Sequence, residues 1–105
     1  MALAQWGPDY QDPNTYLANF ITGGRTQFSD TKYDKFMSQA NGQFVNNPAK
    51  RFQALHQAER QLVQVDKAIV PLNQQVYSIL QNPKLKGVQH HMVGAPFTYA
   101  TAYWK

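Results

Sequence analysis

Two adjacent histidines, His90 and His91, are the first residues whose types could do chemistry. Neighbouring side chains on an extended segment point to opposite faces, so these two imidazoles do not converge on one ion. Metal sites favour spacings such as i,i+4 on a helix. His56 is distant in the sequence, beside the apolar stripe of a predicted helix. We therefore interpret the three histidines as surface or partly buried residues and predict no metal site.

The acidic residues form a second set of candidates, and Asp9 differs from the others. Asp12 and Asp30 precede helical patterns and are typical N-cap residues. Asp9 instead follows Trp6-Gly7-Pro8 and precedes Tyr10. A carboxylate held between aromatic side chains could receive a cationic group. The alternative is a turn aspartate that hydrogen-bonds its own backbone.

The sequence lacks the patterns of common catalytic sites. It has no cysteine, and therefore no thiol nucleophile, disulfide or cysteine-ligated metal. It has no Gly-rich phosphate loop, no Gly-x-Ser-x-Gly and no His-Glu-x-x-His. We predict that the chain is not an enzyme and has no cofactor.

Composition limits the class of protein further. A chain of 105 residues suits one small domain, and 43% apolar residues argue against disorder. Only 15% of the residues are charged, and 13 Gln with 7 Asn supply much of the polarity. The net charge is +4, but the basic residues are scattered, so we expect no nucleic-acid partner. The sequence contains no apolar stretch long enough to span a membrane.

Three helices are predicted to position these residues. They start at Asp12-Pro13, at Ser29-Asp30 and at Asn47-Pro48, where a capping side chain precedes an apolar stripe. The stripes place the phenylalanines Phe20, Phe36 and Phe52 in the core. The full stripes are Tyr16, Leu17, Phe20 and Ile21; Tyr33, Phe36, Met37 and Ala40; and Phe52, Leu55, Ala58, Leu62, Val65 and Ile69.

Short strands are predicted around and after the helices, at Met1–Trp6, Ile69–Leu72, Val76–Leu80 and Phe97–Trp104. The sequence therefore predicts an α+β fold, with three helices followed by short strands.

The segment from Trp6 to Pro13 resembles a signature of oligopeptide-binding proteins, Trp-x-x-Asp-Tyr-x-(Asp/Glu)-Pro. These proteins are the solute-binding components (family 5) of peptide ABC importers. The resemblance continues in order through nearly the whole chain. It includes Tyr33-Asp34, Arg51, Leu55, Ala58-Glu59, Leu62, Ile69–Leu72 and Gly87.

The resemblance implies that residues 1–105 are a partial solute-binding domain, the C-terminal part of a two-lobed, periplasmic-binding-protein-like fold of the α/β type. Residues 1–75 would belong to the C-terminal lobe, and the strands of residues 76–105 would return to the other lobe. We expect an export signal upstream, and hence an extracellular, cell-surface lipoprotein or a periplasmic protein.

The resemblance also implies a ligand site for an oligopeptide. Asp9 would bind the peptide's α-ammonium group, the segment Gln5, Trp6, Gly7 would offer backbone hydrogen bonds, and Trp6 would wall the cleft. Leu3 stands where some relatives have an arginine for the peptide carboxylate. A membrane ABC permease would be the second partner, and the isolated segment could form a homodimer or strand-swapped oligomer. The alternative is a stand-alone interaction module of unknown partner.

Overall fold

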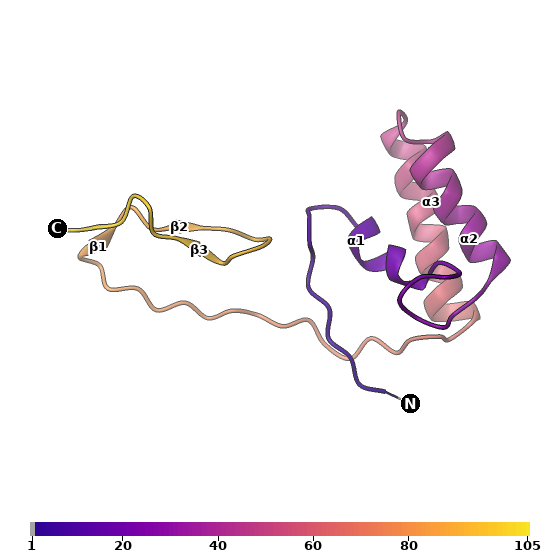
Figure 1. Ribbon diagram of the computed structural model, residues 1–105, viewed down its shortest axis with the longest axis horizontal. Coiled ribbons are helices and arrows are strands. Elements are labelled where there is room, and N and C mark those ends of the chain that lie inside the picture. The colour runs from indigo at the N-terminus through magenta and orange to yellow at the C-terminus, as the bar shows by residue number, and fades with distance from the viewer. Residues whose placement is uncertain (1) are drawn as a thin grey trace. The chain divides into compact units, whose positions relative to one another are not determined.

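The computed structural model describes residues 2–105, which divide into two compact units. Residues 12–71 form the helical unit, and residues 2–11 together with 72–105 form the strand unit. Figure 1 shows the helices α1, α2 and α3 in the first and the strands β1, β2 and β3 in the second. The three predicted helices and the short strands after them are present, so the α+β fold class is confirmed.

The first predicted helix is short. It consists of α1 (Asn14–Leu17) and the 3-10 turn η1 (Ala18–Phe20). Asp12 accepts a hydrogen bond from the backbone N–H of Asn14 at 2.8 Å, which satisfies one of the donors left open at a helix start. Leu17 is buried, but Tyr16 and Ile21, which were predicted to share its face, are 42% and 38% exposed. The helix is too short to bury a whole stripe.

The two longer helices begin at the predicted caps. Asp30 accepts from the N–H of Tyr33 at 2.9 Å at the start of α2 (Thr31–Ser38), and Asn47 accepts from the N–H of Lys50 at 3.1 Å at the start of α3 (Pro48–Arg60). Each helix then widens into a π-helical turn, η2 (Gln39–Gln43) after α2 and η3 (Gln61–Val65) after α3. The helices α2 and α3 pack along each other (Figure 1).

The hydrophobic core lies within the helical unit. The Tyr33 hydroxyl, fully buried, donates to the carbonyl of Leu17 at 2.6 Å and so ties α1 to α2. Burial raises the pKa of this hydroxyl, and the nearby Asp34 carboxylate adds to the shift. The buried apolar residues are Leu17, Tyr33, Met37, Ala40, Ala54, Leu55, Ala58 and Leu62.

The prediction that Phe52 belongs to this core is wrong, since its side chain is 44% exposed. Ala54, Leu55 and Ala58 form the buried face of α3, and Arg51 lies one turn before Leu55 on that face. Phe52 is rotated by a further 100° or so about the helix axis and therefore faces outward.

A polar cluster joins the start of α2 to the end of η3. The side-chain amide of Gln61 donates to Asp30 at 3.0 Å and to Asp66 at 3.1 Å, so one amide bridges the two carboxyl groups. The Tyr33 N–H holds the pKa of Asp30 below its usual value. Desolvation and the Asp30 carboxylate raise the pKa of Asp66.

The strand unit contains two antiparallel ladders of two residues each. β1 (Leu85–Lys86) pairs with β4 (Tyr103–Trp104), and β2 (Gln89–His90) pairs with β3 (Phe97–Thr98). The single strand predicted for residues 97–104 is therefore two short strands separated by a turn. A turn precedes β1, in which the N–H of Leu85 donates to the carbonyl of Asn82 at 2.9 Å.

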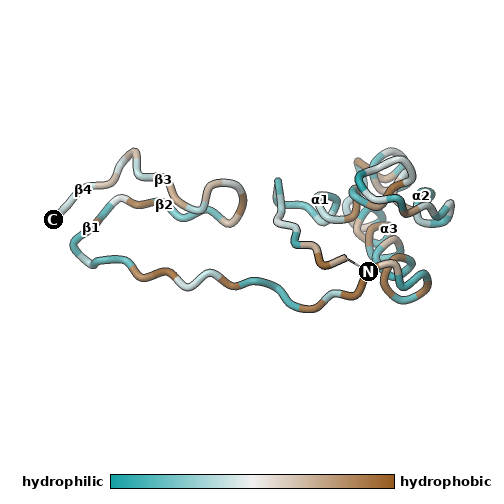
Figure 2. Tube along the Cα trace, turned by 60° about the horizontal axis from the view of Figure 1, so that its bottom comes forward, coloured by the Kyte–Doolittle hydropathy of each residue, from teal (hydrophilic) through white to brown (hydrophobic). Residues whose placement is uncertain are grey.

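The strands predicted at residues 1–6, 69–72 and 76–80 are wrong for this chain. Residues 2–6, 69–72 and 76–80 belong to no strand in the described chain, and Met1 lies outside the described residues. Val70, Val76 and Leu80 are 76%, 82% and 102% exposed, and Figure 2 shows hydrophobic residues along the extended trace before β1. A strand requires a hydrogen-bonded neighbour, and no other segment of residues 2–105 pairs with these.

Within the described part of the chain, no helix combines the length and the apolar character that crossing a membrane requires.

Candidate functional site

The predicted ligand-binding residues lie on one continuous segment of the strand unit. Residues 2–8 run without regular secondary structure, and the chain bends from Asp9 onward. Gln5, Trp6, Gly7 and Asp9 are all exposed. The side-chain amide of Gln5 donates to the side-chain oxygen of Gln75, which links this segment to the extended residues after the helical unit.

The segment offers an acidic side chain, an accessible backbone and an apolar surface. Asp9 is the single acidic side chain in the sequence of the strand unit. A Cβ atom built on Gly7 would meet no atom within 4 Å, so the backbone there borders open space. The Trp6 side chain is 39% exposed and therefore retains apolar surface for contact.

An ion pair fixes the chain shortly after Asp9. The guanidinium of Arg51 on α3 donates to Asp12 through Nη1 at 2.6 Å and through Nη2 at 2.9 Å. The two side chains are 18% and 24% exposed, so water screens the pair only in part. The hydrogen bond from Arg51 is the main reason why the pKa of Asp12 lies below its usual value. The sequence pattern predicted Asp12 as a helix cap but gave no sign of its pairing with Arg51.

The two adjacent histidines lie beside different polar side chains. The His90 ring nitrogen Nε2 lies 3.2 Å from the side-chain oxygen of Gln81, and the His91 Nε2 lies 2.8 Å from the Thr98 hydroxyl. The two imidazoles thus have different partners. Among residues 2–105, no three His, Asp or Glu side chains come close enough together to hold a metal ion.

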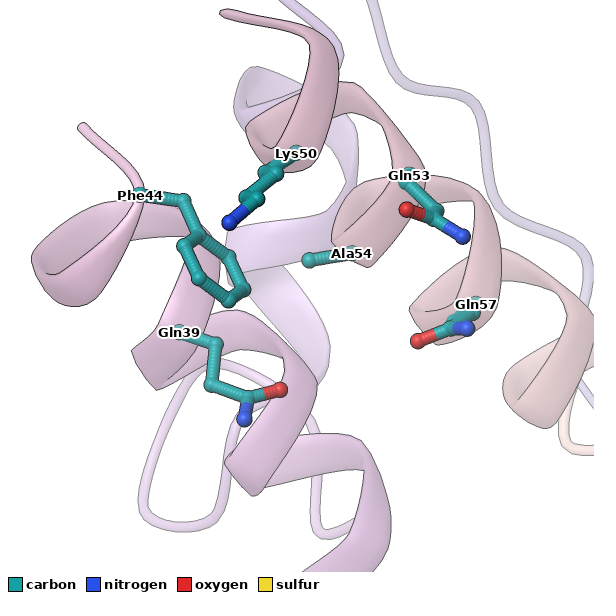
Figure 3. A pocket seen from close by; sticks show the side chains of 6 residues that line it. All are labelled: Gln39, Phe44, Lys50, Gln53, Ala54 and Gln57. Atoms are coloured by element: carbon teal, nitrogen blue, oxygen red, sulfur yellow. The ribbon is translucent and has the colours of Figure 1, made fainter. Parts of the chain in front are cut away.

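A pocket of about 280 Å³ opens between α3 and the η2 end of the α2 helix (Figure 3). It was not predicted from the sequence, because its residues come from separate helices. The Lys50 ammonium lies 5.9 Å from the centre of the Phe44 ring, and amide side chains supply most of the remaining wall. The lining residues are Gln39, Phe44, Lys50, Gln53, Ala54 and Gln57. None of the predicted peptide-binding residues belongs to this pocket.

Known proteins with similar sequences are peptide-binding proteins. The dipeptide-binding protein of Lactococcus lactis is 34% identical over 109 residues, a match that covers 100% of this chain and 20% of that protein. The dipeptide-binding protein DppE of Bacillus subtilis is 36% identical over 90 residues, with 83% of this chain and 16% of that protein covered. No protein-family model matches the chain.

A solved structure supports the same relationship. The substrate-binding domain of an oligopeptide ABC transporter from Bacillus anthracis superposes with a TM-score of 0.84 at 38% sequence identity. The match covers 94% of this chain and 20% of that structure. The chain therefore spans about a fifth of the length of the relatives that it matches. Over its whole length, the chain is homologous to a segment of the substrate-binding proteins of peptide ABC transporters.

Proposed function

We propose that the chain binds oligopeptides as the C-terminal segment of an extracellular substrate-binding protein, which delivers them to a membrane ABC permease. The observation that carries the proposal is the exposed segment Gln5–Asp9, which ends in the one acidic side chain of the strand unit. The homology to dipeptide- and oligopeptide-binding proteins supports peptide as the ligand class.

Asp9 receives the α-ammonium group of the peptide in this proposal. A carboxylate and an ammonium group form a charge-assisted hydrogen bond, which is shorter and stronger than a neutral one. The pair strengthens further when the rest of the protein closes over the ligand and excludes water, because the local dielectric constant falls.

The segment Gln5, Trp6, Gly7 holds the peptide backbone. An extended ligand adds to an extended protein segment through main-chain hydrogen bonds, which are the same for every peptide sequence. The open space beside Gly7 lets a ligand backbone approach closely, and the half-exposed Trp6 indole covers the first ligand residues. This mode of binding gives affinity without strong selection among side chains.

The proposal places the protein outside the cytoplasmic membrane, as a surface lipoprotein or a periplasmic protein, because an importer takes its ligand from that side. It also assigns binding rather than catalysis to the chain, in keeping with the relatives, which are named as binding proteins. A stand-alone interaction module is not favoured, because the similarity covers the whole chain and falls on one class of protein.

Calorimetry with the longer protein that carries this segment tests the role of Asp9. Asp9→Asn should weaken the binding of a peptide with a free amino terminus by at least about 1.5 kcal/mol, the scale of a hydrogen bond to a charged group. N-acetylation of the peptide should weaken its binding to the wild type by a similar amount. It should lower the affinity of the Asp9→Asn variant only slightly further. Glu59→Gln on the exposed side of α3 is the matched control and should bind normally.

Unchanged affinity in Asp9→Asn would contradict the assigned role. The 105-residue chain alone should bind peptides weakly or not at all, because it provides only part of the cleft. Tight and stoichiometric peptide binding by this chain would contradict the proposal that it acts as a segment.

A further inference from the structure

Pro8 stands between the two parts of the proposed peptide site. The backbone of residues 5–7 precedes it, and the carboxylate of Asp9 follows it. Among residues 2–11, Pro8 is the one residue that is half-buried, whereas Gly7 and Asp9 on either side of it are exposed. The segment therefore has a packed point immediately before its acidic side chain.

The proline restricts the backbone on both sides of its own nitrogen. Its ring holds its φ at about −65°. The ring also keeps the residue before it in extended conformations, and that residue is Gly7, a type that otherwise has the most backbone freedom. Gly7 is not among the glycines with positive φ, in agreement with this restriction. The Gly7-Pro8 pair is therefore stiff although it contains a glycine.

This stiffness matters most for the side chain that follows. Main-chain hydrogen bonds along residues 5–7 are spread over several groups, but the Asp9 carboxylate must meet a single ammonium group. Backbone that becomes ordered only on binding lowers the affinity by the entropy that it loses, whereas backbone that is ordered beforehand does not. On the other side of Asp9, the ion pair with Arg51 holds Asp12. Asp9 thus lies between two restrained positions of the chain.

We propose that Pro8 is a positioning residue for the amino end of the peptide. It orders the backbone before Asp9 in the unliganded protein and so aims the carboxylate at the α-ammonium group. The inference rests on the proposed function, because it needs a ligand ammonium group at Asp9. A role limited to the stability of the segment would instead affect all peptides alike, whether their amino end is free or blocked.

Calorimetry with the longer protein compares a peptide that has a free amino terminus with the same peptide after N-acetylation. Pro8→Ala should weaken the binding of the free peptide by about two- to fivefold, the usual effect of a proline's restraint on an equilibrium constant. It should leave the affinity for the acetylated peptide nearly unchanged. Pro8→Gly should weaken the free peptide further, because glycine has more backbone freedom than alanine. Pro83→Ala, at an exposed proline in the turn before β1, is the matched control and should bind both peptides as the wild type does.

The double variant Pro8→Ala/Asp9→Asn tests whether Pro8 acts through Asp9. Once the carboxylate is gone, Pro8→Ala should cause no further loss for the free peptide, because two changes that act through one contact are not additive. Equal losses for the two peptides, an additive loss in the double variant, or no effect of Pro8→Ala would each overturn the proposal for Pro8. If Asp9→Asn still weakens binding in those cases, the proposed function stands, whereas unchanged affinity in Asp9→Asn would overturn both.

Discussion

Arg51 on α3 holds Asp12, which lies 39 residues earlier in the chain, through two parallel hydrogen bonds. The planar guanidinium fits a carboxylate in this two-pronged geometry, whereas an ammonium group does not. The pair thus links the first residue of the helical unit to the longest helix, three positions after the candidate ligand residue Asp9.

Arg51→Lys should lower the free energy of unfolding of the chain by about 1–2 kcal/mol, because it keeps the charge but loses the two-pronged hydrogen bonding. Urea unfolding followed by circular dichroism measures this loss. Arg60→Lys, at the exposed end of the same helix, is the matched control and should unfold almost as the wild type does. Equal stability of the two variants would show that the two-pronged geometry contributes nothing beyond the charge.

The same pair predicts a dependence of stability on pH. The pKa of Asp12 is lower in the folded chain than its ordinary value of 3.8, so its stabilisation is present above about pH 4 and is lost as the pH falls through the folded pKa. Asp66, with a raised pKa, has the opposite dependence and stabilises the fold at low pH. The test is therefore the difference in unfolding free energy between the wild type and Asp12→Asn. This difference should shrink between pH 5 and pH 2, the range over which such carboxylates typically titrate, and a constant difference would contradict the prediction.

Two glycines with similar backbone angles should respond differently to alanine. Gly87 and Gly94 have backbone φ angles of +73° and +80°, which residues with an L side chain rarely adopt. A Cβ on Gly87 would lie 2.0 Å from the carbonyl oxygen of Thr101, whereas a Cβ on Gly94 would meet nothing within 4 Å. Gly87→Ala should therefore disrupt the β1–β4 ladder. Gly94→Ala should lower the free energy of unfolding by only about 1 kcal/mol, the cost of holding an L residue in the left-handed backbone region. Amide hydrogen exchange at Lys105, whose N–H bonds to Lys84, reports on this ladder, and equal exchange in the two variants would count against the prediction.

The unpaired apolar segment before β1 should make the isolated chain associate with itself. Val76 and Leu80 are almost fully exposed on backbone that has no strand partner within residues 2–105, and such segments tend to pair with another chain. Light scattering should detect dimers or larger species at high concentration. Val76→Lys should reduce this association, whereas Val45→Lys, at an exposed position of the helical unit, should not. A wild-type chain that stays monomeric would contradict the expectation.

Local sequence signals determined the helices of this protein. Asp30 and Asn47 each precede a helix and cap it as predicted, because a cap bonds to backbone only two or three residues away. The periodic burial of Tyr33, Met37 and Ala40 was likewise predictable, since it depends on helical spacing alone. The resemblance to oligopeptide-binding proteins also came from the order of short motifs, and the similar proteins confirm it.

Tertiary structure decided everything that depends on a partner far away in the sequence. The sequence could not show that Arg51 pairs with Asp12, because the two residues stand 39 positions apart and no local pattern brings them together. It also could not show that residues 69–72 and 76–80 stay unpaired, because apolar, β-prone residues become a strand only when a neighbour accepts their hydrogen bonds. The sequence also could not show that the β1–β4 register brings Lys105 beside Lys84, 21 residues earlier in the printed sequence, because the pairing joins two distant segments.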